Sequence, residues 1–407
     1  MNIKVTSDFH DGVCSVSLLG RLDSANAEET QKIILDIIKS HPDLSRLCLD
    51  MENLSYISSA GLRTLLVLKS AVPEISIVNA SPAVFITMQM TGFTRIFNVQ
   101  KAFRSVDVSG CTLIALGLSS RVYRLNAETV IKVYPEDTDL SQIRLEQETA
   151  QKAFVLGIPA AISYEIVRTG RQYGIAYKVS DAKCMSSLIA GQPDRLNAHA
   201  ERLAALAREI HFTRIADNQF QNAREAVLSA LSPLRAIIAE AQYDHISSLV
   251  SAIPDTDTLI HGSFHPNSVL FHDGRLEHID IGSAGTGHAP LDLLGLYRLS
   301  GEDKNAPEDP ECFGMTPEIR ARLWHAFCHA YFGENHTPEN MRVLHDYLGR
   351  LSLLKTVADN CLKYLRDRGG PVSQAPELRP GIETLMRCRP EDIRDAADRV
   401  SAFLPKP

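Results

Sequence analysis

Residues 259–271 read LIHGSFHPNSVLF, and residues 276–294 read LEHIDIGSAGTGHAPLDLL. Within them, two short apolar runs at 268–271 and 276–281 lie on either side of a His-Asp-Gly turn at 272–274. Apolar runs of this length around an Asp-Gly turn predict two short strands joined as a hairpin. Histidine, serine and aspartate side chains surround both strands, so these stretches are the first candidates for a chemical site.

The chain on either side of this hairpin changes character. Strands are predicted at residues 113–125, 129–134 and 173–179. Residues 140–154 have the apolar spacing of a helix, and longer helical patterns extend over 197–253 and 317–366. The sequence therefore predicts a small β-rich lobe with one helix, followed by a larger helical lobe.

A lysine in the β-rich lobe is a candidate nucleotide ligand. Lys132 lies among β-branched residues at the end of a predicted strand, from where its ammonium could reach nucleotide phosphates. Glu146, on the predicted helix, could pair with it, and Glu148 is the near alternative. Upstream, Gly117 is the single glycine of ALGLSSRVYRL, where a loop that covers phosphates usually has several. A buried strand with a solvated lysine would explain the same residues.

The two stretches quoted first resemble, in their order, the catalytic and metal-binding segments of the aminoglycoside phosphotransferase and choline kinase group, relatives of protein kinases. That group has His-Gly-Asp-x-His-Pro-x-Asn, then Ile-Asp, then a Gly-His-Pro or Gly-Asp-Pro followed by an Asp. The resemblance covers about residues 109–370 and implies an α+β bilobal kinase-like domain that binds Mg-ATP. It implies that His261 belongs to the catalytic loop, that Asp280 binds magnesium and that Asp292 braces the loop. It also implies that Lys132 and Glu146 are the nucleotide-binding pair.

Two positions depart from the pattern of this group. Ser263 stands where the catalytic aspartate would be, and Ser268 where an asparagine would help to hold the metal. A serine hydroxyl neither accepts the substrate's proton near neutral pH nor adds negative charge beside magnesium. The simplest prediction is a pseudokinase that binds nucleotide through Lys132 and Asp280 without efficient turnover.

Other interpretations stay open. Phosphoryl transfer depends mainly on positioning and electrostatics, and His265 or Asp273 could replace the missing base. The alternative function is therefore an active ATP-dependent phosphotransferase acting on a small hydroxylated or amino compound. A third interpretation is an interaction scaffold that needs neither ligand nor phosphate. His261 could simply support the loop, and Asp292 could cap a helix.

The first 108 residues form a separate pattern. Strands are predicted at residues 3–6, 13–18, 47–49 and 75–78. Helical patterns begin near Ser24, Gly61 and Val84 and alternate with these strands. This order predicts an α/β layer structure of about 100 residues that ends near Val108, where Ser109-Gly110 follows.

The segment DMENLSYISSAGLRTLL, residues 50–66, runs from a strand through a turn into a helix that starts near Ser59. Unpaired amides and the helix dipole make such a helix start favourable for a phosphate. A phosphate there would add about −1.5 to −2 charges to the surface. Serine is also simply a preferred N-cap residue.

The same segment resembles the signature of STAS domains, the fold of bacterial anti-sigma factor antagonists, and the resemblance covers about residues 1–108. It implies that Ser59 is the phosphoacceptor and Asp50 the acidic end of the strand, although Ser58 stands where the family often has Asp. It further implies a docking module that is switched by a serine kinase and binds an anti-sigma-type regulatory protein. The predicted fold class is thus an α/β STAS domain followed by an α+β bilobal kinase-like domain.

Composition limits the remaining possibilities. With 44% hydrophobic and 22% charged residues, the 407-residue chain is typical of folded proteins, and we expect domains at 1–108 and 109–375 and a C-terminal helical extension at 376–407. The net charge of −7 disfavours nucleic acid as a partner. No stretch reaches the ~18 apolar residues of a membrane span, and the first residues lack a signal peptide's apolar core, so we expect a cytoplasmic protein without a membrane partner. The eight cysteines form no Cys-x-x-Cys pair and are expected to be reduced.

Overall fold

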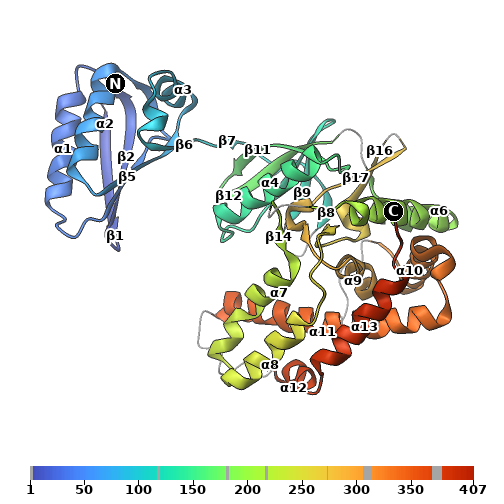
Figure 1. Ribbon diagram of the computed structural model, residues 1–407. Coiled ribbons are helices and arrows are strands. Elements are labelled where there is room, and N and C mark those ends of the chain that lie inside the picture. The colour runs from blue at the N-terminus through green and yellow to red at the C-terminus, as the bar shows by residue number, and fades with distance from the viewer. Residues whose placement is uncertain are drawn as a thin grey trace. The chain divides into compact units, whose positions relative to one another are not determined.

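The computed structural model describes residues 3–116, 120–179, 183–215, 219–272, 274–305, 314–368 and 378–407. By its internal contacts the chain divides into two compact units, Met1–Ser105 and Val106–Pro407 (Figure 1). The boundary expected at Val108 lies three residues beyond this division. None of the described helices is both long and apolar enough to cross a membrane.

The first unit consists of a mixed sheet and three helices that share one hydrophobic core with it. Its elements are β1 (Lys4–His10), β2 (Val13–Leu22), α1 (Ala27–Lys39), β3 (Arg46–Asp50), β4 (Leu54–Ile57), α2 (Ser59–Ala71), β5 (Glu74–Ala80), α3 (Pro82–Met90), η1 (Phe93–Arg95), β6 (Asn98–Lys101) and β7 (Arg104–Ser105). The sheet order is β1-β2-β3-β5-β6, with β4 beside β2 and every pair parallel except β1 with β2. Buried residues alternate along β2 and β3, so one sheet face packs against α1, α2 and α3.

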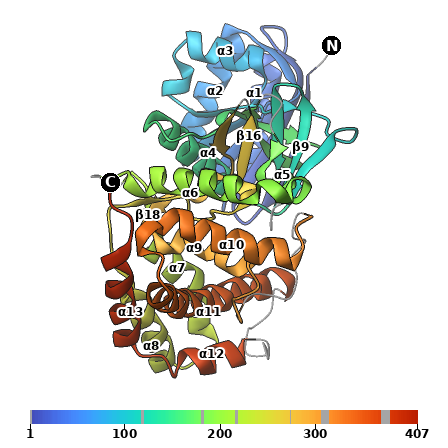
Figure 2. The ribbon, with the colours of Figure 1, turned by 90° about the vertical axis from the view of Figure 1, so that its right-hand side faces the viewer.

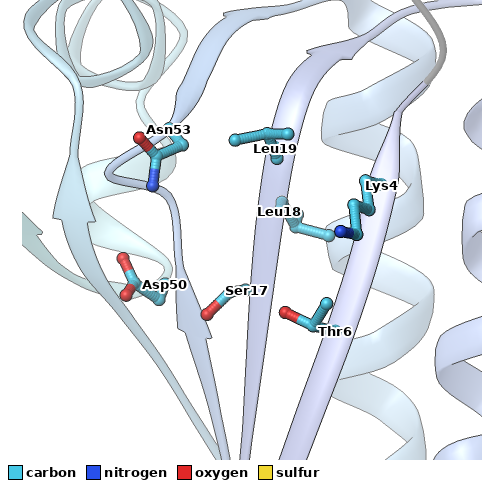
Figure 3. Close-up of a pocket in the computed structure, with 7 residues that line it drawn as sticks. All are labelled: Lys4, Thr6, Ser17, Leu18, Leu19, Asp50 and Asn53. Carbon is cyan, nitrogen blue, oxygen red and sulfur yellow. The ribbon is translucent and has the colours of Figure 1, made fainter.

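Strands β1, β2 and β3 border a hollow of about 160 Å³. It is lined by Lys4, Thr6, Ser17, Leu18, Leu19, Asp50 and Asn53 (Figure 3). At the end of β3, the Asp50 carboxylate accepts hydrogen bonds from the Glu52 amide at 3.0 Å and the Asn79 side chain at 3.2 Å. Hydrogen bonds from nearby residues therefore fix the orientation of the Asp50 carboxylate at the end of β3.

The second unit begins with a β-rich lobe. Its elements are β8 (Thr112–Leu116), β9 (Arg121–Asn126), β10 (Thr129–Val133), α4 (Leu140–Val155), β11 (Ile162–Thr169) and β12 (Gln172–Lys178). The strands are antiparallel in the order β11-β12-β10-β9-β8, and α4 packs on β11 and β12. The predicted β-rich lobe with one helix is confirmed, but β11 was absent from the sequence prediction.

A helical lobe follows. Its helices are α5 (Met185–Gly191), α6 (Leu196–Phe212), α7 (Ala223–Leu231), α8 (Glu240–Ser251), α9 (Pro290–Leu299), α10 (Pro317–Phe332), α11 (Pro338–Arg368), α12 (Arg379–Leu385) and α13 (Pro390–Phe403). Helix α10 packs on α6, and α13 packs on α11 (Figure 2). Their buried faces form one large core that includes Trp324, Phe327 and Tyr347. The last helix, which falls in the C-terminal extension expected at 376–407, therefore packs on the helical lobe.

The remaining elements of the second unit are short. They are β13 (Lys183–Cys184), η2 (Pro193–Arg195), β14 (Gln221–Asn222), η3 (Ser232–Ala236), β15 (Leu259–Ile260), η4 (Pro266–Ser268), β16 (Val269–His272), β17 (Arg275–His278), η5 (Ile281–Ser283), β18 (Gly285–Thr286) and η6 (Gly333–Asn335). Strands β16 and β17 pair antiparallel, with His272 opposite Arg275, which confirms the predicted hairpin. Ser268 is the last residue of η4, Asp280 directly precedes η5, and His261 and Ser263 lie in the loop between β15 and η4.

Candidate functional site

Lys132, Glu146 and Asp280 come together from three separate segments. The Lys132 ammonium on β10 lies 2.6 Å from Glu146 Oε1 on α4, and it also donates a hydrogen bond to Asp280 Oδ1 just before η5. Burial alone would lower the pKa of Lys132, but the two carboxylates outweigh burial and raise it. One buried cation therefore lies between two anions. The alternative partner, Glu148, is exposed on α4.

Backbone geometry explains how these side chains meet. Asp280 adopts the left-handed conformation with φ of 67°, which turns the chain sharply into η5. Two residues later, a Cβ at Gly282 would lie 1.6 Å from Glu146 Cγ. Glycine at 282 therefore lets α4 approach η5 closely enough for Glu146 and Asp280 to share the same ammonium.

The loop after β15 is held by Asp292, in the first turn of α9. Its carboxylate accepts hydrogen bonds from the amides of His261, at 2.6 Å, and Gly262, at 2.7 Å, and its side chain is 1% exposed. Gly262 has φ of 82°, and a Cβ there would lie 2.1 Å from the carbonyl oxygen of Ser283. Both oxygens of Asp292 thus face the loop backbone, and this contact orients the residue that follows, Ser263.

Ser263 lies half-buried in this loop, and its amide donates a hydrogen bond to Nδ1 of His261 at 3.3 Å. The His261 side chain is fully buried, and burial lowers its pKa, so the ring is neutral. The ring packs in the interior beneath the loop backbone. Residue 263, where the resemblance predicts a catalytic aspartate, thus lies next to backbone amides that Asp292 holds, and its side chain is a hydroxyl.

Two residues that the sequence analysis missed complete the brace. His211, at the end of α6, approaches Asp292 Oδ2 with its Nε2 at 3.1 Å, and its Nδ1 lies 2.7 Å from the Tyr331 hydroxyl on α10. All three side chains are buried. His211 is separated from its two partners by 81 and 120 residues, so no local spacing pattern could have revealed this contact.

The predicted metal ligand Ser268 has a structural contact of its own. Its hydroxyl donates to the carbonyl oxygen of His265 at 2.8 Å and accepts from the amide of the same residue at 3.1 Å. The neighbouring Asn267 accepts hydrogen bonds from Ser186 and from the Cys184 thiol. Across the described part of the chain, no three His, Cys, Asp or Glu side chains form a metal-binding group. Metal binding by Ser268 stays a prediction, and so does metal binding by Asp280, whose carboxylate accepts a hydrogen bond from Lys132 on β10.

Neutral histidines are a further feature of this region. Burial lowers the pKa of His265 and of His288 to about 4, and it lowers the pKa of His278 well below its usual value. His261 and His278 are both completely buried, with ring centroids 4.8 Å apart. The interior below the loop therefore accommodates these rings only without charge.

These histidines predict a stability that falls with acidification. A histidine titrates near 6.5 in the unfolded chain, so between pH 6.5 and 4 the unfolded state binds more protons than the folded state, and stability rises with pH. From pH 7 to 5 we expect a loss of roughly 2 kcal/mol for each of His265 and His288. The measurement is urea unfolding at a series of pH values. His288→Gln should flatten this slope, whereas His10→Gln, at an exposed site, should not; equal slopes for both would contradict the assignment.

In the first unit, helix α2 starts at Ser59, which is exposed. Ser58 is the N-cap, and its hydroxyl accepts a hydrogen bond from the Gly61 amide at 3.3 Å. The N-cap role therefore belongs to Ser58, and the Ser59 side chain is open to solvent at the first helical position. Two other residues named from the sequence, Gly117 and the alternative base Asp273, lie outside the described residues.

Two known protein families match different parts of the chain. The phosphotransferase enzyme family matches residues 110–344, and the STAS domain family matches residues 4–108. A protein of Bordetella bronchiseptica, named as the anti-sigma factor antagonist BtrV, is 34% identical over 102 residues, which cover 24% of this chain and 85% of that relative.

Two solved structures are similar to the chain as well. The gentamicin complex of APH(2'')-IIa has 18% identity and a TM-score of 0.41, over 70% of this chain and 94% of that one. A choline/ethanolamine kinase family protein from Mesorhizobium loti has 16% identity and a TM-score of 0.42, over 72% and 94%. On the matched residues, the chain belongs to the phosphotransferase enzyme family and carries a STAS domain at its N-terminal end.

Proposed function

We propose that the phosphotransferase-family domain binds a magnesium nucleotide without efficient phosphoryl transfer, and that the STAS domain docks a regulatory partner under the control of Ser59. The observation that carries the first part is the contact of the buried Lys132 with Glu146 and Asp280, which is present although Ser263 stands at the position expected for the loop aspartate. The protein would then respond to a ligand instead of converting one.

The residues present fit a magnesium nucleotide in part. Lys132 is fully charged and oriented by Glu146, so it would bind a phosphate, and Asp280 would bind the metal. Magnesium, when bound, would neutralise charge on the phosphates. The resemblance predicts a second magnesium ligand at residue 268. The Ser268 hydroxyl, however, is hydrogen-bonded to His265, and the neighbouring Asn267 side chain is hydrogen-bonded to Ser186. This combination supports binding more than turnover.

An active ATP-dependent phosphotransferase for a small hydroxylated or amino compound is the second candidate. It is favoured by the same intact group around Lys132, because phosphoryl transfer relies mainly on electrostatics. Its weakness is the base: a histidine with a pKa of about 4, such as His265, is a poor proton acceptor at neutral pH. The neighbourhood of Ser263 thus favours the pseudokinase.

Thermal unfolding with and without nucleotide tests the proposal. Mg-ATP at 100 times its Kd should stabilise the full-length protein by about 2.7 kcal/mol, while magnesium alone should not. The same preparation should show no more ATP turnover than a blank. Absence of stabilisation would indicate a scaffold, and rapid turnover would indicate the phosphotransferase.

For the STAS domain we expect a charge-controlled interaction. The similarity to BtrV, together with the exposure of Ser59 at a helix start, supports a docking surface that a phosphate would alter. Ser59→Asp should weaken capture of the partner from native cells about tenfold relative to Ser59→Ala, measured by quantitative mass spectrometry. Ser70→Asp, exposed near the other end of α2, is the matched control. Equal capture by the two Ser59 variants would eliminate the switch.

A further inference from the structure

The C-terminal helix α13, which lies beyond the family match that ends at residue 344, contacts the segment leading to Asp292. His288 is 3% exposed, and its ring nitrogens approach two hydroxyls: Nδ1 lies 2.9 Å from Tyr347 on α11, and Nε2 lies 3.0 Å from Ser401 on α13. One imidazole therefore connects this segment to two helices of the C-terminal part of the chain.

The hydrogen-bond roles at this imidazole follow from its partners. The Ser401 hydroxyl donates to the carbonyl oxygen of Ala397 at 2.8 Å, so towards His288 it acts as the acceptor. Nε2 therefore carries the proton, and Nδ1 accepts from the hydroxyl of Tyr347. Burial keeps the ring neutral by lowering its pKa to about 4. Both ring nitrogens of His288 therefore have a defined partner, and the Ser401 hydroxyl has two.

The position of His288 is transmitted to the loop by the start of α9. The carbonyl oxygen of His288 accepts from the amide of Leu291 at 2.9 Å, and that of Ala289 accepts from the amide of Asp292 at 3.0 Å. Asp292 in turn holds the amides of His261 and Gly262. Only three residues thus lie between His288 and Asp292, whose carboxylate orients the loop, and this segment forms one hydrogen-bonded turn.

We propose that Ser401 and Tyr347 are positioning residues for the loop that carries Ser263, acting through His288 and Asp292. Helix α13 then contributes to the conformation of the loop, in addition to packing on the helical lobe. The inference deepens the proposed nucleotide site and rests on it for its functional consequence, while its structural consequence can be measured without any ligand.

Hydrogen–deuterium exchange of the full-length protein tests the structural part, followed by mass spectrometry of a peptide spanning residues 259–265. Tyr347→Phe leaves a buried Nδ1 without its donor, so exchange at the loop amides should accelerate about tenfold. Ser401→Ala should accelerate it less, about threefold, because Ser401 is exposed and water can take its place. Ser401→Thr, which keeps the hydroxyl, should exchange as wild type does.

Asn335→Ala is the matched control for α13. The Asn335 side chain donates to the carbonyl oxygen of Phe403 at 3.2 Å, at the end of the same helix, without touching His288. This variant should leave exchange in the loop peptide unchanged. Acceleration equal to that of Ser401→Ala, or failure of Ser401→Thr to restore wild-type exchange, would overturn the proposal.

The functional part uses the Kd for Mg-ATP, measured by calorimetry on the same variants. We expect a several-fold weaker Kd in Tyr347→Phe and wild-type affinity in Asn335→Ala. If the wild type binds no Mg-ATP while the exchange pattern is as expected, the proposed function fails and the positioning stands. If the wild type binds and Tyr347→Phe changes neither exchange nor affinity, the positioning fails and the nucleotide site stands.

Discussion

Replacing Ser263 by Asp is expected to raise ATP turnover of the full-length protein by about 100-fold. A positioned general base typically contributes ~10²- to 10⁴-fold, and the lower end applies because Ser268 would still occupy the second altered position. The backbone at 263 is already oriented by the Asp292 contacts with His261 and Gly262, so the new carboxylate would enter a prepared loop. Release of phosphate from Mg-ATP, with water as the acceptor, is the measurement.

Ser263→Ala is the control for this experiment, because it removes the hydroxyl without adding a base. It should bind Mg-ATP like the wild type and show the same low turnover. Fast turnover by the wild type that disappears in Ser263→Ala would mean that the hydroxyl itself takes part in the reaction. That outcome would exclude the pseudokinase interpretation.

Replacing Asp280 by Asn should weaken the binding of Mg-ATP about 100-fold. Even residues behind a metal ligand cost 10- to 100-fold in metal affinity when altered, and Asp280 is the predicted ligand itself. Lys132 would keep its pair with Glu146, so the protein without ligand should stay folded. The measurement is the Kd from calorimetry at constant magnesium, together with the unfolding midpoint without nucleotide.

Asp137→Asn is the matched control for Asp280→Asn. Asp137 is an exposed carboxylate that, with Glu146, lines a hollow between the end of β10 and α4, so this variant makes the same change of charge nearby. It should alter the Kd by less than about twofold, since exposed charges interact weakly. Similar losses in both variants would indicate a general electrostatic effect and not a magnesium ligand.

Local sequence patterns predicted much of the fold. The alternation of β2 and β3, the hairpin β16–β17 and the single helix α4 of the β-rich lobe all follow from spacing that is written within a few residues. The weaker predictions were also local. Residues 197–253 were taken as one helical pattern but form α6, α7 and α8, and residues 317–366 are interrupted at Gly333, where φ of 56° ends α10.

Strand β11 shows why a local pattern can fail. Residues 162–169 read ISYEIVRT, in which polar and apolar side chains do not alternate regularly. The strand has a register shift between Ser163 and Glu165 in its pairing with β12. Such a bulge changes which side chains face the core, so the period of two is lost. The partner strand, and not the segment's own pattern, specifies this element.

The sequence alone determined which side chains are chemically capable: Lys132, Glu146 and Asp280 are charged, and Ser263 is not. Only the tertiary structure decided that Lys132 pairs with Glu146 and not Glu148, and that Asp292 is held by His211. The physical reason is range. Spacing along a chain encodes which face of a helix or strand a residue occupies, whereas contacts between residues 81 or 113 positions apart, such as His211 with Asp292 and His288 with Ser401, exist only once the helices have packed.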